Sequence, residues 1–206
     1  ENDSLDDFTN NFRTTYLNRT DFLRGNFKYV VDKLPENFLF IGYLLKLLPR
    51  AKIIRTFRNP WDVAVSLYKQ RYVTNIPYSA SFFNIGVFMS NFEVVNNYWS
   101  EQLKETNNLL DVRYEELVNN PESFQKQIYE FLELQSDFDE NKRRGFFSQT
   151  ASIRQIGSPV HSNSIQKEEF LEHKEEFYEA LQMQRKYWEK KGYNKPSSDY
   201  FGYKLD

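Results

Sequence analysis

The stretch that most constrains the fold runs over residues 51–72 and reads AKIIRTFRNPWDVAVSLYKQRY. Residues 52–57 are rich in Ile, Thr and Phe without strict alternation, a pattern typical of a strand buried on both faces. A helix is predicted to begin after Asn59, which suits the N-cap position, with Pro60 in its first turn. A buried strand followed at once by a helix favours an α/β domain.

Polar residues around this strand and helix predict an anion site. Arg58 follows the carboxyl end of the strand, where open α/β sheets bind ligands, and its guanidinium suits a phosphate. The helix start offers free N–H groups, and Ser66 can donate a further hydrogen bond. The alternative is that Arg58 forms a surface ion pair and Ser66 is only solvated.

Length and composition bound the function. A chain of 206 residues is long enough for one domain with a sizeable core, and we predict a single domain over residues 1–206. A net charge of −2 gives no general attraction to nucleic acid, so no nucleic-acid partner is expected. With no Cys and two His, we expect no metal, no disulfide and no thiol catalysis.

Membrane and targeting signals are not visible in the sequence. The longest apolar run, residues 38–48, is too short to span a bilayer, and no signal peptide is recognisable. The lack of Cys fits a reducing compartment. We therefore expect a cytoplasmic protein, or one of the Golgi lumen if the full-length protein is eukaryotic.

Strand and helix signals alternate along the chain, which predicts a central parallel sheet flanked by helices. The segment 37–48 is apolar nearly all round and is predicted to be a buried helix. Gly192 suits a helix C-cap. Helices are predicted over 5–17, 37–48, 82–105 and 166–191, and from 60 and 120 onward; strands over 27–31, 52–57 and 109–113; and loops over 71–81 and 150–164.

The sequence from Arg58 to Tyr68, RNPWDVAVSLY, resembles the 3′-phosphate-binding segment of the sulfotransferases that use 3′-phosphoadenosine 5′-phosphosulfate. In that family an Arg and a Ser eight positions later hold the 3′-phosphate, which implies this role for Arg58 and Ser66. The resemblance also implies a P-loop-like three-layer fold, a nucleotide co-substrate and no metal.

Two further segments follow the same family in the same order. Residues 32–38, DKLPENF, resemble the D/E-K-x-P segment of the protein-tyrosine and carbohydrate sulfotransferases. The Lys of that segment lies near the transferred group, which implies that Lys33 stabilises developing charge. Residues 114–117, YEEL, are similar to a segment whose Tyr contacts the adenine, which implies this contact for Tyr114. Alone, Lys33 is better explained as a surface-loop residue and Tyr114 as a half-buried residue at a strand end.

A fourth segment, TASIRQ at 150–155, resembles a stretch of the bacterial-type relatives that closes over the nucleotide. The resemblance implies that Ser152 and Arg154 contact the nucleotide. A polar surface loop is the alternative.

One element of the family has no counterpart in this chain. Sulfotransferases hold the 5′-phosphosulfate on a Gly/Ser/Thr loop between a first strand and a helix, where backbone N–H groups converge. The chain has no G-x-x-x-x-G-K-[ST] sequence, and its first residue is Glu. We expect the carboxyl-terminal part of a longer domain, without the first strand and loop. Alternatively, the loop was lost and the domain now only binds a ligand or partner.

The sequence therefore predicts an enzyme that moves a sulfuryl group from 3′-phosphoadenosine 5′-phosphosulfate to a hydroxyl or amine. The acceptor, whether a carbohydrate, a protein tyrosine or a small alcohol, is not encoded in any motif. The alternative is a catalytically incomplete fragment, or a nucleotide- or partner-binding module of the same fold. A P-loop kinase is disfavoured because no Walker lysine or Mg-binding acidic pair follows a strand.

Overall fold

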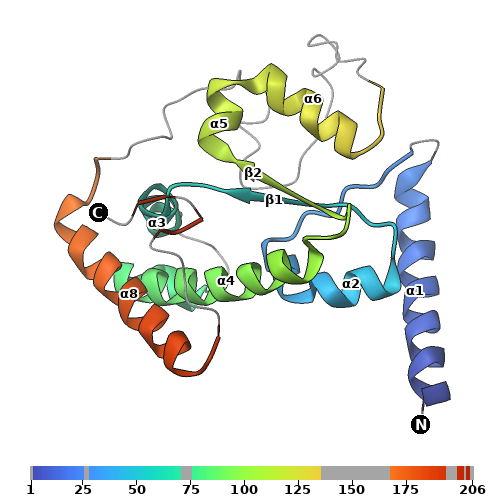
Figure 1. Cartoon of the computed structure of the whole chain (residues 1–206), viewed down its shortest axis with the longest axis horizontal. Helices are drawn as coiled ribbons and strands as arrows, with labels where there is room; N and C mark the ends of the chain where they lie inside the picture. The colour runs from blue at the N-terminus through green and yellow to red at the C-terminus, as the bar shows by residue number, and fades with distance from the viewer. Residues whose placement is uncertain are drawn as a thin grey trace.

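The computed structural model describes residues 2–25, 28–70, 76–135, 168–193, 199–201 and 203–204. The predicted loop 150–164, with Ser152 and Arg154, lies outside these residues. The elements are α1 (Asn2–Arg24), η1 (Pro35–Phe40), α2 (Ile41–Leu47), β1 (Ile53–Phe57), α3 (Pro60–Lys69), η2 (Pro77–Ala80), α4 (Phe82–Leu103), β2 (Leu109–Arg113), α5 (Tyr114–Asn119), α6 (Pro121–Phe131), η4 (Leu171–His173) and α8 (Lys174–Lys190) (Figure 1).

The described strands β1 and β2 form a parallel pair in which Ile53 lies opposite Leu109 and Phe57 opposite Arg113. The connection between them runs through α3 and α4, as parallel strands require a long crossover. In Figure 1, α4 lies on one side of the pair, and α5 and α6 lie on the other. The predicted α/β class and parallel pairing are confirmed for this pair.

The two faces of β1 are not equally covered. Arg55 and Phe57 point to the covered face and are buried, whereas Ile54 and Thr56 alternate with them and are exposed. The prediction of a strand buried on both faces is therefore wrong. The reason is that α5 and α6 pack against β2 rather than β1.

Aromatic side chains from α3, α4 and α8 build the main core. The ring of Trp61 lies 5.2 Å from that of Phe82 and 5.8 Å from that of Phe177, centroid to centroid. At Gly86 a Cβ would lie 2.5 Å from the carbonyl oxygen of Phe177, so a glycine lets α4 and α8 approach closely. Burying each of these rings contributes about 1.5–3 kcal/mol.

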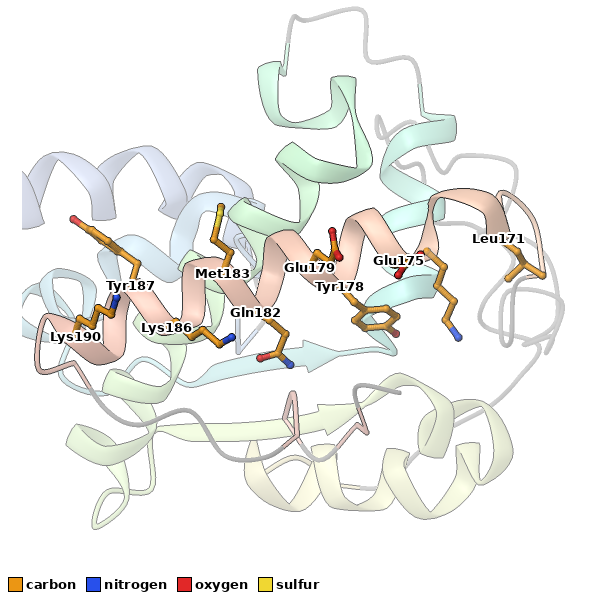
Figure 2. Close-up of a pocket in the computed structure, with 10 residues that line it drawn as sticks. Leu171, Glu175, Tyr178, Glu179, Gln182, Met183, Lys186, Tyr187 and Lys190 are labelled. Atoms are coloured by element: carbon orange, nitrogen blue, oxygen red, sulfur yellow. The ribbon is translucent and has the colours of Figure 1, made fainter.

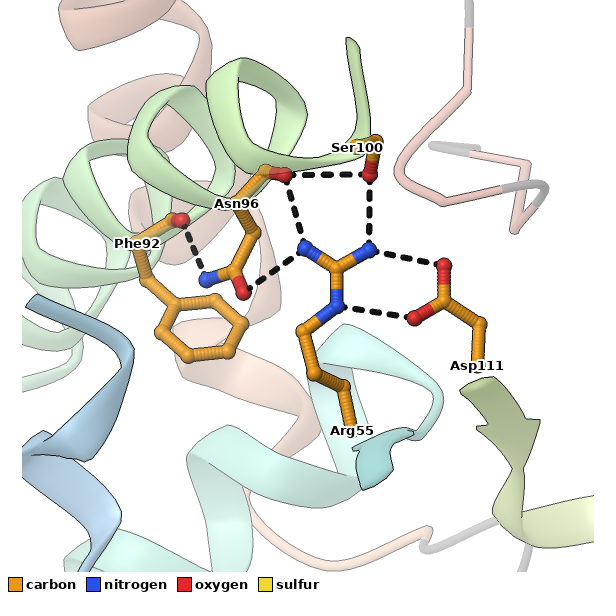
Figure 3. Close-up of polar contacts among 5 residues, drawn as sticks. All are labelled: Arg55, Phe92, Asn96, Ser100 and Asp111. Carbon is orange, nitrogen blue, oxygen red and sulfur yellow. Dashed lines mark hydrogen bonds and ion pairs between the residues drawn. The ribbon is translucent and has the colours of Figure 1, made fainter. Parts of the chain in front are cut away.

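A buried arginine fastens the strand pair to α4 (Figure 3). The Arg55 guanidinium donates to both carboxylate oxygens of Asp111 at 2.7 and 2.8 Å, and to the carbonyl oxygen of Asn96 at 2.7 Å. It also donates to the Ser100 hydroxyl at 2.7 Å. Because Asp111 lies opposite Arg55 in the register, this fork fixes β1 against β2 as well as against α4.

A second buried ion pair joins α4 to α8. The Arg185 guanidinium donates to both carboxylate oxygens of Glu93 at 2.7 and 2.8 Å, and to the carbonyl oxygen of Asp199 at 2.7 Å. The side chains of Glu93 and Arg185 are 1% and 5% exposed. The second contact anchors the residues near the carboxyl terminus beside α8.

The helix predictions agree with the structure in kind and differ at the boundaries. The predicted helices at 60 and 82–105 and the strand at 109–113 are confirmed as α3, α4 and β2. The predicted helix 5–17 is the middle of the longer α1. The final helix begins only at Lys174, because Phe170 adopts a left-handed conformation with φ 59°. Gly192, with φ 78°, ends that helix as predicted.

Two predictions near the amino terminus are wrong. Residues 28–31 form no strand; the side chains of Lys28 and Tyr29 bond to the carbonyl oxygens of Glu133 and Leu132 after α6. The segment 37–48 is divided between η1 and α2 and is not buried all round. Phe40 is 52% exposed, because this segment meets α4 on one side only.

We expect Glu93→Ala to lower the free energy of unfolding by about 3–5 kcal/mol, because it leaves the Arg185 charge buried without its partner. Lys69→Ala is the matched control: its pair with Glu169 is half exposed and should cost less than about 1 kcal/mol. Urea denaturation of both variants checks this. Equal losses would show that the buried pair does not stabilise the packing of α4 on α8.

Candidate active site

The start of α3 is capped by the side chain that the sequence predicts. Asn59 Oδ1 accepts the backbone N–H of Trp61 at 3.0 Å and that of Asp62 at 3.2 Å. The Val63 N–H bonds to the Asn59 carbonyl oxygen at 3.0 Å, and Pro60 has no N–H. The prediction that this helix start offers free N–H groups to an anion is therefore wrong, because the cap already uses them. An anion here would depend on side chains.

Arg58 lies between the last residue of β1 and this cap. Its guanidinium carbon is 4.9 Å from the centroid of the Tyr114 ring, which is a cation–π distance. Its Nη2 is 3.8 Å from Oδ2 of Asp62, whose side chain is only 1% exposed. That separation gives charge attraction but no hydrogen bond. A ring and a carboxylate thus hold the guanidinium in place.

The donors of this guanidinium are unpaired. Nε and Nη2 of Arg58 are buried and have no hydrogen-bond partner among the described residues, although the side chain is 18% exposed overall. A buried donor left unpaired costs about 1–3 kcal/mol. An oxygen anion that accepts from both nitrogens would remove this cost, so the site is suited to a phosphate or sulfate group.

The strand register explains why Arg58 meets Tyr114. Phe57 and Arg113 are partners at the carboxyl ends of β1 and β2, so the next residue of each chain segment emerges at the same edge. Two residues 56 positions apart in the sequence are therefore adjacent in space. The predicted site residues Arg58 and Tyr114 are brought together.

Ser66 lies further along α3. It is half-buried, and its hydroxyl makes no hydrogen bond to the part of the chain that the structure describes. Asp62 and Ser66 are four residues apart and so share one side of the helix. Because Arg58 meets Asp62, the three residues follow one another along this side. No hydrogen bond joins Arg58 directly to Ser66.

Lys33 lies in the extended segment between α1 and η1. Its side chain is exposed, and no hydrogen bond or ion pair joins it to Arg58, Ser66 or Tyr114. The preceding residue, Asp32, accepts a hydrogen bond of 2.9 Å from the Tyr16 hydroxyl on α1. Burial and this bond raise the pKa of Tyr16 to about 12, so the hydroxyl remains a donor at neutral pH.

The sequence model of the sulfotransferase family matches residues 1–140. The chain belongs to this family. An uncharacterized protein of Aquifex aeolicus (strain VF5) is 29% identical over 160 residues, which is 74% of this chain and 20% of that protein. The chain therefore spans about a fifth of the length of this relative. The family match contains Lys33, Arg58, Ser66 and Tyr114 and ends before Ser152 and Arg154.

Sequence reasoning missed two residues that lie beside Arg58. One carboxylate oxygen of Glu115 accepts the Asn59 N–H at 2.8 Å, and the other accepts the hydroxyl of Tyr203. Burial, reinforced by this hydrogen bond, raises the pKa of Tyr203 far above its ordinary value. Glu115 stands in the YEEL segment and could have been found there, whereas no local pattern marks Tyr203.

A separate hollow of about 960 Å³ runs along α8 (Figure 2). Among the described residues, its lining comes from α8 and the short η4 before it, and does not include Lys33, Arg58, Ser66 or Tyr114. Its lining is Leu171, Lys174, Glu175, Tyr178, Glu179, Gln182, Met183, Lys186, Tyr187 and Lys190.

The described residues contain no group of three or more His, Cys, Asp or Glu that could hold a metal ion. Within the same ranges, no helix combines the length and the apolar character needed to cross a membrane.

We expect Asn59→Ala to destabilise the protein by about 0.5–2 kcal/mol, because two first-turn N–H groups of α3 lose their acceptor. Asn59→Ser retains a capping oxygen and should remain near the wild-type value. Thermal and urea unfolding of the two variants provide the measurement. The capping assignment is wrong if Ala and Ser variants are equally stable.

Proposed function

We propose that the chain carries the nucleotide-binding part of an enzyme that transfers a sulfuryl group from 3′-phosphoadenosine 5′-phosphosulfate to a hydroxyl or amine. Family membership supports sulfotransfer in general. The observation that carries the nucleotide assignment is the pair of buried, unpaired donors on Arg58. Such donors are suited to a phosphate that contacts the guanidinium through two oxygens.

In this proposal the 3′-phosphate binds Arg58, and Ser66 donates its hydroxyl to the same group. The negative charge of the neighbouring Asp62 carboxylate repels an anion. Phosphate binding therefore depends on hydrogen bonds from N–H donors rather than on net charge. At 3.8 Å the carboxylate attracts the guanidinium without forming a hydrogen bond, so Nε and Nη2 keep no acceptor among the described residues. The ammonium of a lysine lacks the planar fork of N–H donors and would not replace the Arg58 guanidinium.

Tyr114 would contact the adenine of the same nucleotide. The guanidinium of Arg58 occupies one face of the ring, so the base would use the other face or the edge. Stacking of a base on an aromatic ring contributes about 1–3 kcal/mol. The contact between Arg58 and Tyr114 supports this proposal because it puts a phosphate ligand and a stacking surface side by side.

Lys33 would stabilise the charge that develops as the sulfuryl group leaves the nucleotide. Its exposed ammonium makes no ion pair within the described ranges, which leaves it available to an anionic ligand. Ser152 and Arg154 would close over the nucleotide. These three assignments rest on the resemblance to the family.

The remaining parts of the proposal concern the domain, the metal requirement, the acceptor and the compartment. We propose a single P-loop-like three-layer domain and no metal in the reaction. The acceptor is a hydroxyl or amine of a carbohydrate, a protein tyrosine or a small alcohol. The lack of Cys fits a reducing compartment such as the cytoplasm.

Calorimetric titration with adenosine 3′,5′-bisphosphate tests the nucleotide site. Arg58→Ala should weaken binding by about 10- to 100-fold, because charge-assisted hydrogen bonds contribute about 1.5–3 kcal/mol. Ser66→Ala should weaken it by about 2- to 10-fold, since it loses one neutral donor. Arg58→Lys should also bind poorly, because it retains the charge and loses the fork.

Arg50→Ala is the matched control. Arg50 is exposed and precedes β1, at the opposite end of the strand from Arg58. Its removal changes the net charge equally and should leave affinity within about twofold of wild type. If wild type and the folded Arg58→Ala variant bind the bisphosphate equally, the assigned site is wrong.

A further inference from the structure

A turn near the carboxyl terminus reaches the edge of the strand pair where Arg58 lies. The backbone N–H of Tyr200 bonds to the carbonyl oxygen of Tyr203 at 2.8 Å, and the reverse bond measures 2.9 Å. Tyr200 is buried, and its hydroxyl lies 3.3 Å from the carbonyl oxygen of Met89. The ring of Phe201 stacks on that of Phe57 at 4.1 Å. These contacts fix the turn to α4 and to the last residue of β1.

Tyr203 lies next to the peptide group before Arg58 and is linked through Glu115 to the peptide group after it. Its hydroxyl donates to Glu115, and the other oxygen of Glu115 accepts the Asn59 N–H, which belongs to the peptide after Arg58. The carbonyl oxygen of Phe57, which belongs to the peptide before Arg58, lies 3.5 Å from the same hydroxyl. One phenol group thus lies near the backbone on one side of Arg58 and is linked through Glu115 to the backbone on the other side.

The surroundings keep this hydroxyl in place as a donor. The guanidinium carbon of Arg113 lies 4.7 Å from the centre of the Tyr203 ring, and Arg113 also donates to the carbonyl oxygen of Phe201 at 2.5 Å. Burial raises the pKa of Tyr203, so the phenol stays protonated at neutral pH. Glu115 also stands next to Tyr114, on which the Arg58 guanidinium rests.

We propose that Tyr203 is a positioning residue for the 3′-phosphate site: through Glu115 and Asn59 it fixes the backbone of Arg58, so that Nε and Nη2 are preorganised for the anion. This inference rests on the proposed function. Preorganised donors bind more tightly because less ordering remains to be done on binding. Because these contacts reach the backbone of Arg58, the proposed ligand of the 3′-phosphate, the effect should fall on ligands that carry a 3′-phosphate.

Calorimetry on Tyr203→Phe with two nucleotides tests the inference. Adenosine 3′,5′-bisphosphate should bind about 3- to 10-fold more weakly than to wild type, whereas adenosine 5′-monophosphate should bind within about twofold of wild type. Glu115→Gln keeps the length of the side chain and should likewise weaken binding of the bisphosphate but not of the monophosphate. Tyr98→Phe is the matched control, because Tyr98 is 52% exposed on α4, and it should change neither affinity.

A second readout needs no ligand. In the free protein, the NMR signal of the Arg58 Nε–H should shift in Tyr203→Phe and Glu115→Gln but not in Tyr98→Phe. The inference is overturned if this signal does not move, if the bisphosphate binds Tyr203→Phe as tightly as wild type, or if both nucleotides weaken equally. If wild type fails to bind the bisphosphate while the signal still shifts, the proposed function fails and the positioning role stands.

Discussion

The site depends on the Arg58 guanidinium, which is fixed in position although two of its nitrogens have no hydrogen-bond partner among the described residues. Arg58 lies on the Tyr114 ring and faces the buried carboxylate of Asp62, and these contacts fix its place without a hydrogen bond from Nε or Nη2. A surface arginine would leave its donors in water, and a structural one would pair them. Arg55, three residues earlier, shows the second case: each of its nitrogens has an acceptor. The contrast between two arginines of one segment separates the structural role from the proposed ligand-binding role.

The pairing of β1 with β2 positions both Arg55 and Arg58. The parallel register brings Arg55 opposite Asp111 and makes Arg58 and Tyr114 emerge together at the carboxyl edge. Burying Arg55 on α4 therefore also sets the position of the site, because a slip of one residue would reverse which side chains face α4. The Glu93–Arg185 pair extends this arrangement to α8 and to the residues that lead to Tyr203. Stability and the proposed function thus depend on one framework.

The sequence predicted local features better than distant ones. The cap at Asn59, the strand at 109–113 and the glycine that ends α8 depend on neighbouring residues, and each is confirmed. Free N–H groups at the helix start were predicted wrongly, because a good capping residue removes the donors that its helix would offer. The contact of Arg58 with Tyr114 follows from register rather than from any local pattern. Glu115 and Tyr203 act across 88 residues, a separation that periodicity cannot detect.

The central claim is that the unpaired donors of Arg58 hold the 3′-phosphate of the nucleotide. A crystal structure of the chain with adenosine 3′,5′-bisphosphate tests it most directly. The account predicts 3′-phosphate oxygens about 2.7–2.9 Å from Nε and Nη2 of Arg58, next to the Ser66 hydroxyl, with the Tyr114 ring still beneath the guanidinium. A bisphosphate bound elsewhere, with Arg58 unchanged and still without an acceptor, would contradict it.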